Sequence, residues 1–348
     1  MADLALFRFT SKNDLAKSLF SGWQLARKVV VNALAGDDII QGSTKLELIR
    51  GLVVKSGAKL MAGNGNDVIS GSSATSEGLK NSGYLLAGDG SDRISGLSEG
   101  RFGIYNTKLI STGEGSDSII GRSTYGILID GCWNGENGFW NESQINTGDG
   151  NDRIVGSSIG TGLVNSGAIE TGYGNDSIKG TGGSNRESYG SYGFSWGVYN
   201  NPNCTIKTGP GNDIITGAGG KGCFGIFNDG NISTGGGDDK VNAIAGGFRG
   251  SGTTDLGPGA DALIGFVGAD TASISGGAGG KFIGGTGKDK ILLPDGLYRI
   301  EGGLIALASG GRFMKTNSFE KIGGVNGGLF NFADGLLTIT GGVATSLV

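Results

Sequence analysis

Aspartates recur in this sequence inside short glycine-rich segments, and a carboxylate repeated in this way can bind metal ions or cap backbone amides. Six copies read MAGNGNDVISG, LAGDGSDRISG, STGEGSDSIIG, NTGDGNDRIVG, ETGYGNDSIKG and KTGPGNDIITG, and weaker copies read LAGDDIIQG, STGGGDDKVNA, DLGPGADALIG and GGTGKDKILL. The acids at the centres of these repeats lie 22 to 37 residues apart and are Asp38, Asp67, Asp92, Asp117, Asp152, Asp176, Asp213, Asp239, Asp261 and Asp289.

Glycine and aliphatic columns emerge when the repeats are aligned on these acids. Glycine stands two residues before every acid, and isoleucine, valine or leucine stands two residues after it. Glycine also stands four residues after the acid in eight of the ten repeats, the exceptions being Ala243 and Leu293. A variable residue such as Arg93 or Lys240 separates the acid from the aliphatic residue, which is the alternation of a short strand with one buried face.

Two further strands are expected between successive acids. One carries the pattern G-I-x-N, as at residues 103–106, and the other has an apolar residue, such as Ile145, two positions before the Thr-Gly or Ala-Gly turn. Three strands and three turns in about 24 residues close one coil, and no coil could bury its apolar face alone. The pattern therefore predicts an all-β fold, a right-handed parallel β-helix (β-solenoid) of about ten coils with an N-terminal helical cap.

Stacking of the coils would place successive Asp carboxylates roughly 4.8 Å apart. At an effective dielectric of about 20, two unit charges at that distance repel by about 3.5 kcal/mol, so the column needs countercharge. Ca²⁺ takes roughly six to eight oxygen ligands, which carboxylates and turn carbonyls of adjacent coils could supply. The alternative is a set of Asx-turns in which each Asp caps backbone amides without metal. The ten aligned copies favour calcium, with all ten acids as ligands.

The repeats resemble those of the haemolysin-type calcium-binding proteins (RTX, repeat-in-toxin), whose turns read G-G-x-G-x-D-x-U-x, over residues 36 to 293. This resemblance implies Ca²⁺ bound inside a parallel β-roll and secretion without a cleaved N-terminal signal. Family members usually repeat every nine or so residues, whereas one Asp turn falls in each longer coil here, so ions are expected along one edge only. Ice-binding members with similar spacing carry outward Thr arrays. Ice binding is not expected here, because the variable turn position holds Asn64, Asp89, Glu114, Asp149, Tyr173, Pro210 and Gly236.

The two ends of the chain differ from the repeats. Residues 1–32 are expected to cap the stack, because the apolar residues of segment 15–26 fit an amphipathic helix with Ser11 or Asn13 as its N-cap. Residues 33–293 would form the calcium-binding β-helix, and residues 294–348 a C-terminal cap with a secretion-type tail. No apolar run approaches the roughly 18 residues of a membrane span, and the N-terminus lacks the features of a signal peptide. We expect an extracellular or cell-surface location, reached by type I-like secretion without a cleaved signal peptide.

Composition excludes several classes of protein and site. Glycine accounts for 74 of 348 residues without a three-residue period, which excludes collagen, and a hydrophobic content of 37% is too high for a disordered chain. A net charge of −4 and the lack of a basic stripe argue against nucleic acid as a partner. The absence of histidine removes the usual zinc sites and Ser-His triads. Cys132, Cys204 and Cys223 are expected to be small buried side chains rather than a disulfide framework.

One turn of each coil carries asparagine in register: Asn81, Asn106, Asn165, Asn200 and Asn228, with Asp130 expected at the intervening level. Stacked amides there would form a structural ladder rather than a ligand site. Two coils are longer by about eleven residues than the regular coils. The segment GCWNGENGFWNES is expected to follow the G-I-x-N strand, and the segment GGSNRESYGSYGFSW to precede it two coils later, so that they flank opposite ends of one face.

The outward positions of the G-I-x-N strand form an unusually apolar row: Lys80, Tyr105, Ile129, Val164, Tyr199 and Phe227. One interpretation is a groove for a glycan or a partner protein, and the other is that the inserted loops fold over the row and bury it. The residues expected to bind a ligand or partner are Tyr105, Trp133, Phe139, Trp140, Tyr189, Tyr192, Trp196, Tyr199 and Phe227.

The sequence favours a secreted, calcium-stabilised structural or adhesive protein of a surface or matrix, with carbohydrate or further copies of itself as partners. The alternative is a polysaccharide lyase or hydrolase on the same scaffold, with Glu136, Glu142, Arg186 and Glu187 as acid, base or clamp. No two carboxylates have the spacing of a recognisable catalytic pair. An enzyme is therefore the less favoured hypothesis, and no catalytic residue is assigned.

Overall fold

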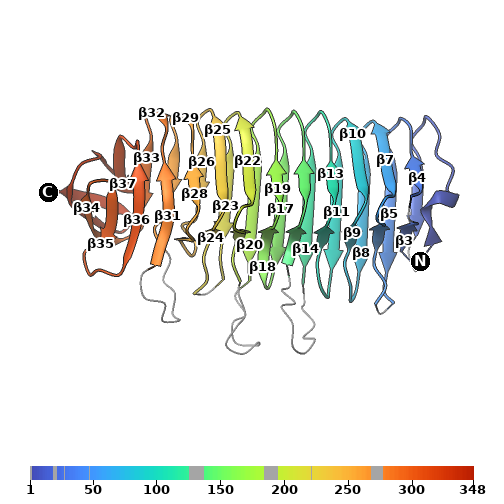
Figure 1. Ribbon diagram of the computed structural model, residues 1–348, viewed down its shortest axis with the longest axis horizontal. Coiled ribbons are helices and arrows are strands. Elements are labelled where there is room, and N and C mark those ends of the chain that lie inside the picture. Colours follow the sequence, from blue (N-terminus) through green and yellow to red (C-terminus); the bar gives the residue numbers. More distant parts are fainter. Residues whose placement is uncertain are drawn as a thin grey trace.

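The computed structural model describes residues 2–18, 22–26, 28–46, 48–124, 137–183, 195–220, 222–267 and 277–348. Over these residues the chain winds into a straight rod of stacked coils (Figure 1), and its regular structure is β-strand apart from a 3-10 helix, η1 (Leu4–Leu6). Three ladders of parallel strands run along the rod, and we name them ladders A, B and C. The right-handed parallel β-helix predicted from the repeats is confirmed.

Ladder A is a sheet of ten short strands and contains the G-I-x-N segments. Each coil contributes one strand, and every pair is parallel and in register, as in the pairing of Ile104 with Leu79. The strands are β1 (Ala2–Asp3), β3 (Trp23–Leu25), β6 (Leu52–Val54), β9 (Leu79–Asn81), β12 (Ile104–Asn106), β15 (Asn137–Asn141), β18 (Thr161–Asn165), β21 (Val198–Asn200), β24 (Ile226–Asn228) and β27 (Phe248–Arg249).

Ladder B consists of the strands that follow the Asp turns, and ladder C of the strands that precede them. The strands of ladder B are β2 (Leu15–Ser18), β5 (Ile39–Thr44), β8 (Val68–Ser73), β11 (Arg93–Ser98), β14 (Ser118–Ser123), β17 (Arg153–Ser158), β20 (Ser177–Gly182), β23 (Ile214–Ala218), β26 (Lys240–Asn242), β30 (Ala262–Ile264), β33 (Lys290–Leu293) and β37 (Lys321–Gly324). The strands of ladder C are β4 (Val30–Asn32), β7 (Lys59–Asn64), β10 (Tyr84–Asp89), β13 (Leu109–Ser111), β16 (Gln144–Asn146), β19 (Ala168–Glu170), β22 (Thr205–Pro210), β25 (Asn231–Gly236), β28 (Thr253–Asp255), β31 (Gly277–Ile283) and β36 (Arg312–Asn317).

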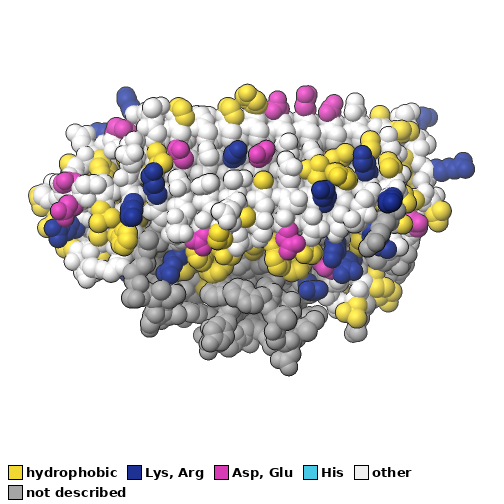
Figure 2. Space-filling model, in the orientation of Figure 1, with side chains coloured by type: hydrophobic (Ala, Val, Ile, Leu, Met, Phe, Trp, Pro, Cys, Tyr) yellow, Lys and Arg dark blue, Asp and Glu magenta, His cyan; other side chains and the backbone are white. Residues whose placement is uncertain are grey.

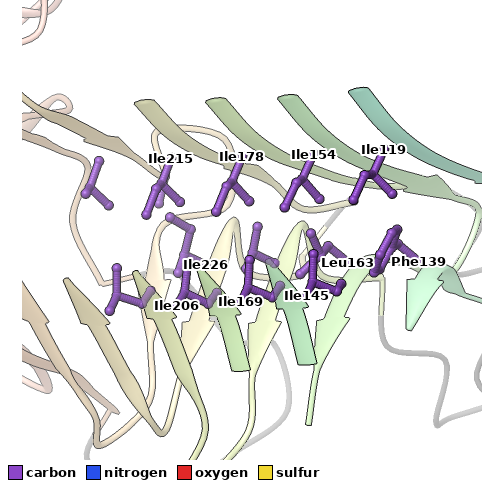
Figure 3. Packing of buried hydrophobic residues seen from close by; sticks show 14 of the residues in the cluster. Ile119, Phe139, Ile145, Ile154, Leu163, Ile169, Ile178, Ile206, Ile215 and Ile226 are labelled. Atoms are coloured by element: carbon purple, nitrogen blue, oxygen red, sulfur yellow. The ribbon is translucent and has the colours of Figure 1, made fainter. Parts of the chain in front are cut away.

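The core is a stack of mainly aliphatic side chains contributed by all three ladders (Figure 3). At one level Ile154 of ladder B and Ile145 of ladder C are fully buried, and Leu163 of ladder A lies opposite them. The residue two positions after each repeat Asp is buried in every coil, as the column alignment predicts. Because each coil contacts the coils above and below it, the apolar surface is buried by stacking.

A bend with no room for side chains joins ladder B to ladder A. A Cβ atom placed on Gly156 would lie 2.1 Å from the carbonyl oxygen of Gly162, and one on Gly121 would lie 2.3 Å from that of Gly138. This close approach explains both the glycine four residues after the Asp and the glycine that opens G-I-x-N. The exception at Leu293 lies beyond the last strand of ladder A, where its side chain is fully buried.

The N-terminal segment contradicts the predicted helical cap. Strand β2 pairs with β5 and β3 with β6, so residues 15–18 and 23–25 already belong to the stack. Ala16 and Leu25 are fully buried whereas Leu15 is exposed. Short apolar runs fit a helix or a strand equally well, and here pairing with the next coil decides the outcome. The helix prediction was therefore wrong.

The C-terminal end of the rod is closed by antiparallel strands (Figure 1). They are β34 (Gly296–Glu301), β35 (Leu304–Leu307), β38 (Gly327–Asn331), β39 (Gly335–Thr340) and β40 (Val343–Leu347). Apart from this cap, β29 (Pro258–Gly259) and β32 (Thr286–Gly287) form a separate parallel pair. Tyr298 and Met314 are buried in the same core as the coils, with the Tyr298 ring 4.9 Å from that of Phe266.

Candidate functional site

The Asp turns have a backbone conformation that only glycine adopts freely. In one coil Gly148 has φ 88° and Gly150 has φ 146°, in the left-handed region where other residues are strained. A Cβ atom on Gly150 would lie 1.7 Å from the carbonyl oxygen of Gly115 in the preceding coil. Backbone carbonyls of one turn therefore lie directly against the next turn, in a space that a side chain would fill.

One carboxylate oxygen of every repeat Asp bonds to the preceding coil. The N–H of Asp117 donates to Oδ1 of Asp152 at 2.8 Å, and the N–H of Asp152 donates to Oδ1 of Asp176 at 2.8 Å. The same bond recurs at 2.7 to 2.9 Å from the first coil to the last. We call this series the Asp ladder. Its Oδ1 atoms accept hydrogen bonds from backbone amides, as expected in the alternative interpretation in which each Asp caps amides and binds no metal.

A second series of hydrogen bonds runs beside the Asp ladder, and its side chains accept from the following coil instead of the preceding one. In seven of the ten repeats the residue before the Asp uses its side-chain oxygen to accept from the backbone of the following coil, as when Asn175 N–H donates to Asn151 Oδ1 at 2.7 Å. Equivalent bonds join Asn212 to Asn175 and Asp238 to Asn212. The preference for Asn, Asp or Ser at this position follows from this acceptor role.

The other carboxylate oxygen of each repeat Asp is buried and has no hydrogen-bond partner. This holds for Oδ2 of all ten acids predicted to bind metal, and their side chains are at most 2% exposed. An unpaired charged oxygen in such a place carries a large desolvation penalty. Either a proton or a cation must therefore accompany these atoms.

Burial is the main reason that these carboxyl groups resist ionisation. It raises the pKa of Asp152 to about 7 against the opposing effects of the Thr147 side chain and of the hydrogen bond from the Asp117 N–H, and the charges of Asp117 and Asp176 raise it further. Burial likewise raises the pKa of Asp92 and of Asp261 to about 7. The pKa of every other acid in the series is raised as well. Ionisation at neutral pH thus needs a compensating charge.

The oxygens of these turns suit a hard divalent cation. Each coil offers one orphaned carboxylate oxygen together with turn carbonyls that face the neighbouring coil, and calcium accepts such mixed oxygen ligands in a flexible geometry. In the part of the chain that the structure describes, no three acidic or cysteine side chains converge closely enough to hold a metal ion by themselves. Most ligands of any ion here would therefore be backbone oxygens, with carboxylates from successive coils.

The asparagine corner is a closed hydrogen-bonded stack, as predicted. Asn165 Nδ2 donates to Asn200 Oδ1 at 2.9 Å, and Asn141 Nδ2 donates to Asn165 Oδ1 at 2.9 Å. Asn141 occupies the level at which Asp130 was expected, and Asp130 itself lies outside the described residues. The register prediction was wrong at this level because GFWN forms the ladder A strand that pairs with β12.

This register also changes where the two long segments enter the coil. Residues 125–136 connect β14 to β15, and residues 184–194 lie between β20 and β21, so both join ladder B to ladder A. They enter at the same corner and not at opposite ends of a face. Whether these two segments border a groove or fold over the apolar row concerns residues outside the described ranges.

The outward residues of ladder A form a single column along the rod. Register pairs Lys80 with Tyr105, Tyr105 with Trp140, Val164 with Tyr199, and Tyr199 with Phe227. We call this column the aromatic strip, and Trp140 takes the place predicted for Ile129. Tyr105, Trp140, Tyr199 and Phe227 are partly exposed. Figure 2 shows hydrophobic side chains gathered along the lower rim of the rod with charged side chains beside them.

Two residues predicted to contact a ligand are buried. Phe139 is fully buried because it points into the core beside Ile104 and Leu163, so its prediction as a ligand-binding residue was wrong. Trp196 is 8% exposed and packs edge-on to Tyr199 and Phe227 at 4.5 and 4.8 Å between ring centres. Trp133, Tyr189 and Tyr192 lie outside the described residues.

Polar groups border the strip. The Tyr105 hydroxyl donates to Glu142 Oε2 at 2.9 Å, and Lys80 Nζ lies 5.0 Å from the centre of the Tyr105 ring. Burial and the hydrogen bond to Glu142 together raise the pKa of Tyr105 to about 12. Glu136, Arg186 and Glu187, considered with Glu142 for catalysis, lie outside the described residues. Cys204 and Cys223 are buried free thiols, as predicted, and Cys132 is not among the described residues.

Comparison with solved structures finds a distant structural likeness. No family model matches the sequence, and no curated protein matches it. Among solved structures, a hyperactive, Ca²⁺-dependent, β-helical antifreeze protein from an Antarctic bacterium is similar with a TM-score of 0.34 and 15% identity, over 82% of this chain and 78% of that one. A search of the described residues for a helix long and apolar enough to cross a membrane finds none.

The Asp ladder has two end members that the repeat alignment missed. Asp14 N–H donates to Asp38 Oδ1 at 2.7 Å, and Asp289 N–H donates to Glu320 Oε2 at 2.7 Å. Neither end has the preceding glycine on which the alignment relied. A signal was nevertheless present, because Ala16 and Ile322 each stand two residues after the acid.

Proposed function

We propose that this chain is a calcium-stabilised β-helix that serves as a structural or adhesive component of a surface or extracellular matrix. The observation that carries the proposal is the row of buried, partnerless Oδ2 atoms on the Asp ladder. Ten such atoms in one straight file are costly without a cation. The resemblance of the turns to RTX repeats supports the same ion.

The role proposed for calcium is structural. The ion would bind Asp Oδ2 atoms and turn carbonyls, and it would neutralise carboxylates whose pKa burial raises. Each coil supplies one repeat carboxylate, and sites of low charge resemble extracellular modules with dissociation constants near 10⁻⁴ to 10⁻³ M, roughly. Such sites fill at extracellular calcium concentrations and stay empty in the cytosol. This supports the extracellular location.

Thermal unfolding in calcium and in EGTA tests the proposal. The melting temperature should rise as CaCl₂ increases through the millimolar range and fall when EGTA is added, because binding to the native state stabilises it by mass action. Mg²⁺ at equal concentration should do much less, since it requires a stricter octahedral geometry. A melting temperature that ignores both calcium and EGTA would refute the metal role.

Fractionation tests the location. Native protein recovered from its source should lie at the cell surface or in the medium. Recovery in the cytoplasmic fraction alone would contradict an extracellular role while leaving the calcium measurement unaffected.

A further inference from the structure

The rings of the aromatic strip and the buried rings beside it form the same arrangement of side chains twice. In the first copy Phe102, Tyr105 and Trp140 contact one another, with ring centres 5.2 to 5.6 Å apart. In the second, Trp196, Tyr199 and Phe227 contact one another at 4.5 to 4.9 Å. Each triad spans two coils.

The two triads match position by position. The buried ring lies three residues before the tyrosine in both, as Phe102 before Tyr105 and Trp196 before Tyr199, and it is 3% exposed in the first and 8% in the second. The ring on the next coil is followed two residues later by an acid, Glu142 in the first and Asp229 in the second.

One acid accompanies each triad, and a cationic residue stands at each end of the strip. Glu142 accepts the Tyr105 hydroxyl at 2.9 Å, whereas Asp229 accepts from the N–H and hydroxyl of Ser251. Burial, with a further contribution from the charge of Asp229, raises the pKa of Tyr199. Lys80 lies over the Tyr105 ring on the coil before the first triad. Arg249, on the coil after the second, lies 5.4 Å from the centre of the Phe224 ring.

The spacing of the triads is fixed by the stacking of coils. Tyr105 and Tyr199 are three steps apart in register, through Trp140 and Val164. Three strand spacings amount to about 14 Å, along a straight axis. A ligand that contacts both triads must therefore be long, straight and repetitive.

From this geometry we propose that the two triads are equivalent subsites for one linear polysaccharide of pyranose sugars. Such a chain has apolar C–H faces that stack on aromatic rings, and hydroxyls that can bond to Glu142, Asp229, Lys80 and Arg249. The strip from Lys80 to Arg249 is one outward side chain wide at each level. A standard protein partner needs about 800 Å² and roughly 20 to 30 residues on each side, which this column does not offer. The inference extends the adhesive role proposed above by naming its ligand class.

Affinity electrophoresis of the calcium-loaded protein tests this inference, with hydroxyethylcellulose, dextran and alginate as the immobilised polysaccharides. Migration should be retarded by at least one of them. Trp140→Ala or Phe227→Ala should each weaken the retarding interaction about tenfold, which corresponds to about 1.4 kcal/mol, and the double variant should abolish it. Tyr173→Ala is the matched control, because Tyr173 is 64% exposed on the Asp turns and outside the strip.

Glu142→Gln keeps every ring in place and should weaken the interaction several-fold, so that the test does not depend on the fold tolerating loss of a ring. Failure of all three polysaccharides to retard the protein would overturn the inference. So would unchanged retardation of the double variant, or equal loss in Tyr173→Ala. The calcium dependence of the melting temperature, recorded on the same samples, reports separately on the proposed function.

Discussion

Replacement of Asp152 by asparagine should have opposite effects on the metal-free and the calcium-bound protein. Asp152 lies in the middle of the Asp ladder, 1% exposed, with Oδ1 bonded to the Asp117 N–H and Oδ2 without a partner. Asparagine keeps an Oδ1 acceptor for that N–H and carries no charge. It therefore removes a buried charge from the metal-free protein, and it removes a ligand from the calcium-bound protein.

The size of the first effect follows from the pKa. Burial raises the pKa of Asp152 from 3.8 to about 7, and each pKa unit corresponds to about 1.36 kcal/mol. Above pH 7 the ionised side chain thus destabilises the metal-free fold by about 4 kcal/mol, compared with an unshifted carboxylate. Asparagine should recover part of this, so its melting temperature in EGTA at pH 8 should exceed that of the wild type. In millimolar calcium the order should reverse.

Scanning calorimetry of the wild type and of Asp152→Asn, each in EGTA and in millimolar calcium, gives the four melting temperatures needed. Asp149→Asn is the matched control, since Asp149 is an exposed carboxylate three residues earlier in the same turn. It should shift the melting temperature little in either condition. If Asp152→Asn destabilised the protein equally in EGTA and in calcium, the carboxylate would be a hydrogen-bond acceptor only, and the metal argument would fail.

Three further predictions concern pH, the glycine bend and the asparagine corner. Folded pKa values raised to about 7 mean that the native state binds more protons than the unfolded state between about pH 4 and 7. Stability in EGTA should therefore fall as pH rises through this window and level off above it, while the gain from calcium grows; melting curves against pH measure both. Gly156→Ala should cost about 2 to 3 kcal/mol in urea unfolding, because its Cβ would meet a backbone oxygen at 2.1 Å, whereas Gly236→Ala, with its nearest neighbour at 3.8 Å, should be tolerated. Asn165→Ala should cost about 3 kcal/mol by leaving buried partners unpaired, and exposed Asn231→Ala should cost little by the same assay.

Much of the fold follows from the sequence because the repeat is a physical constraint at each position. Glycine is needed where two backbones meet, an aliphatic residue where the core lies, and an acid where the preceding coil presents an N–H. These requirements recur in every coil, so alignment of the copies reveals them. The ladder register and the buried column two residues after each acid were predictable for this reason.

Features that occur only once in the chain were harder to predict from the sequence. The N-terminal strands carry no glycine signature, and their conformation depends on pairing with β5 and β6. The strand containing Phe139 was misplaced because ILID (127–130) and GFWN (138–141) each match only part of the G-I-x-N pattern, and the pairing of GFWN with β12 and β18 decides the register. The partnerless Oδ2 atoms are a property of three-dimensional burial, which a repeat pattern does not reveal.

The stacking of coils by bonds parallel to the rod axis also sets how the molecule responds to mechanical force. Tension applied to the two ends loads the bonds between neighbouring coils one coil at a time, starting from an end. Detachment of a 24-residue coil such as that between Asp152 and Asp176 would release about 80 Å of chain. The 35-residue coil that precedes it would release about 120 Å. The rod would lengthen in discrete steps, and the two long coils would mark how far along the axis the rupture had travelled.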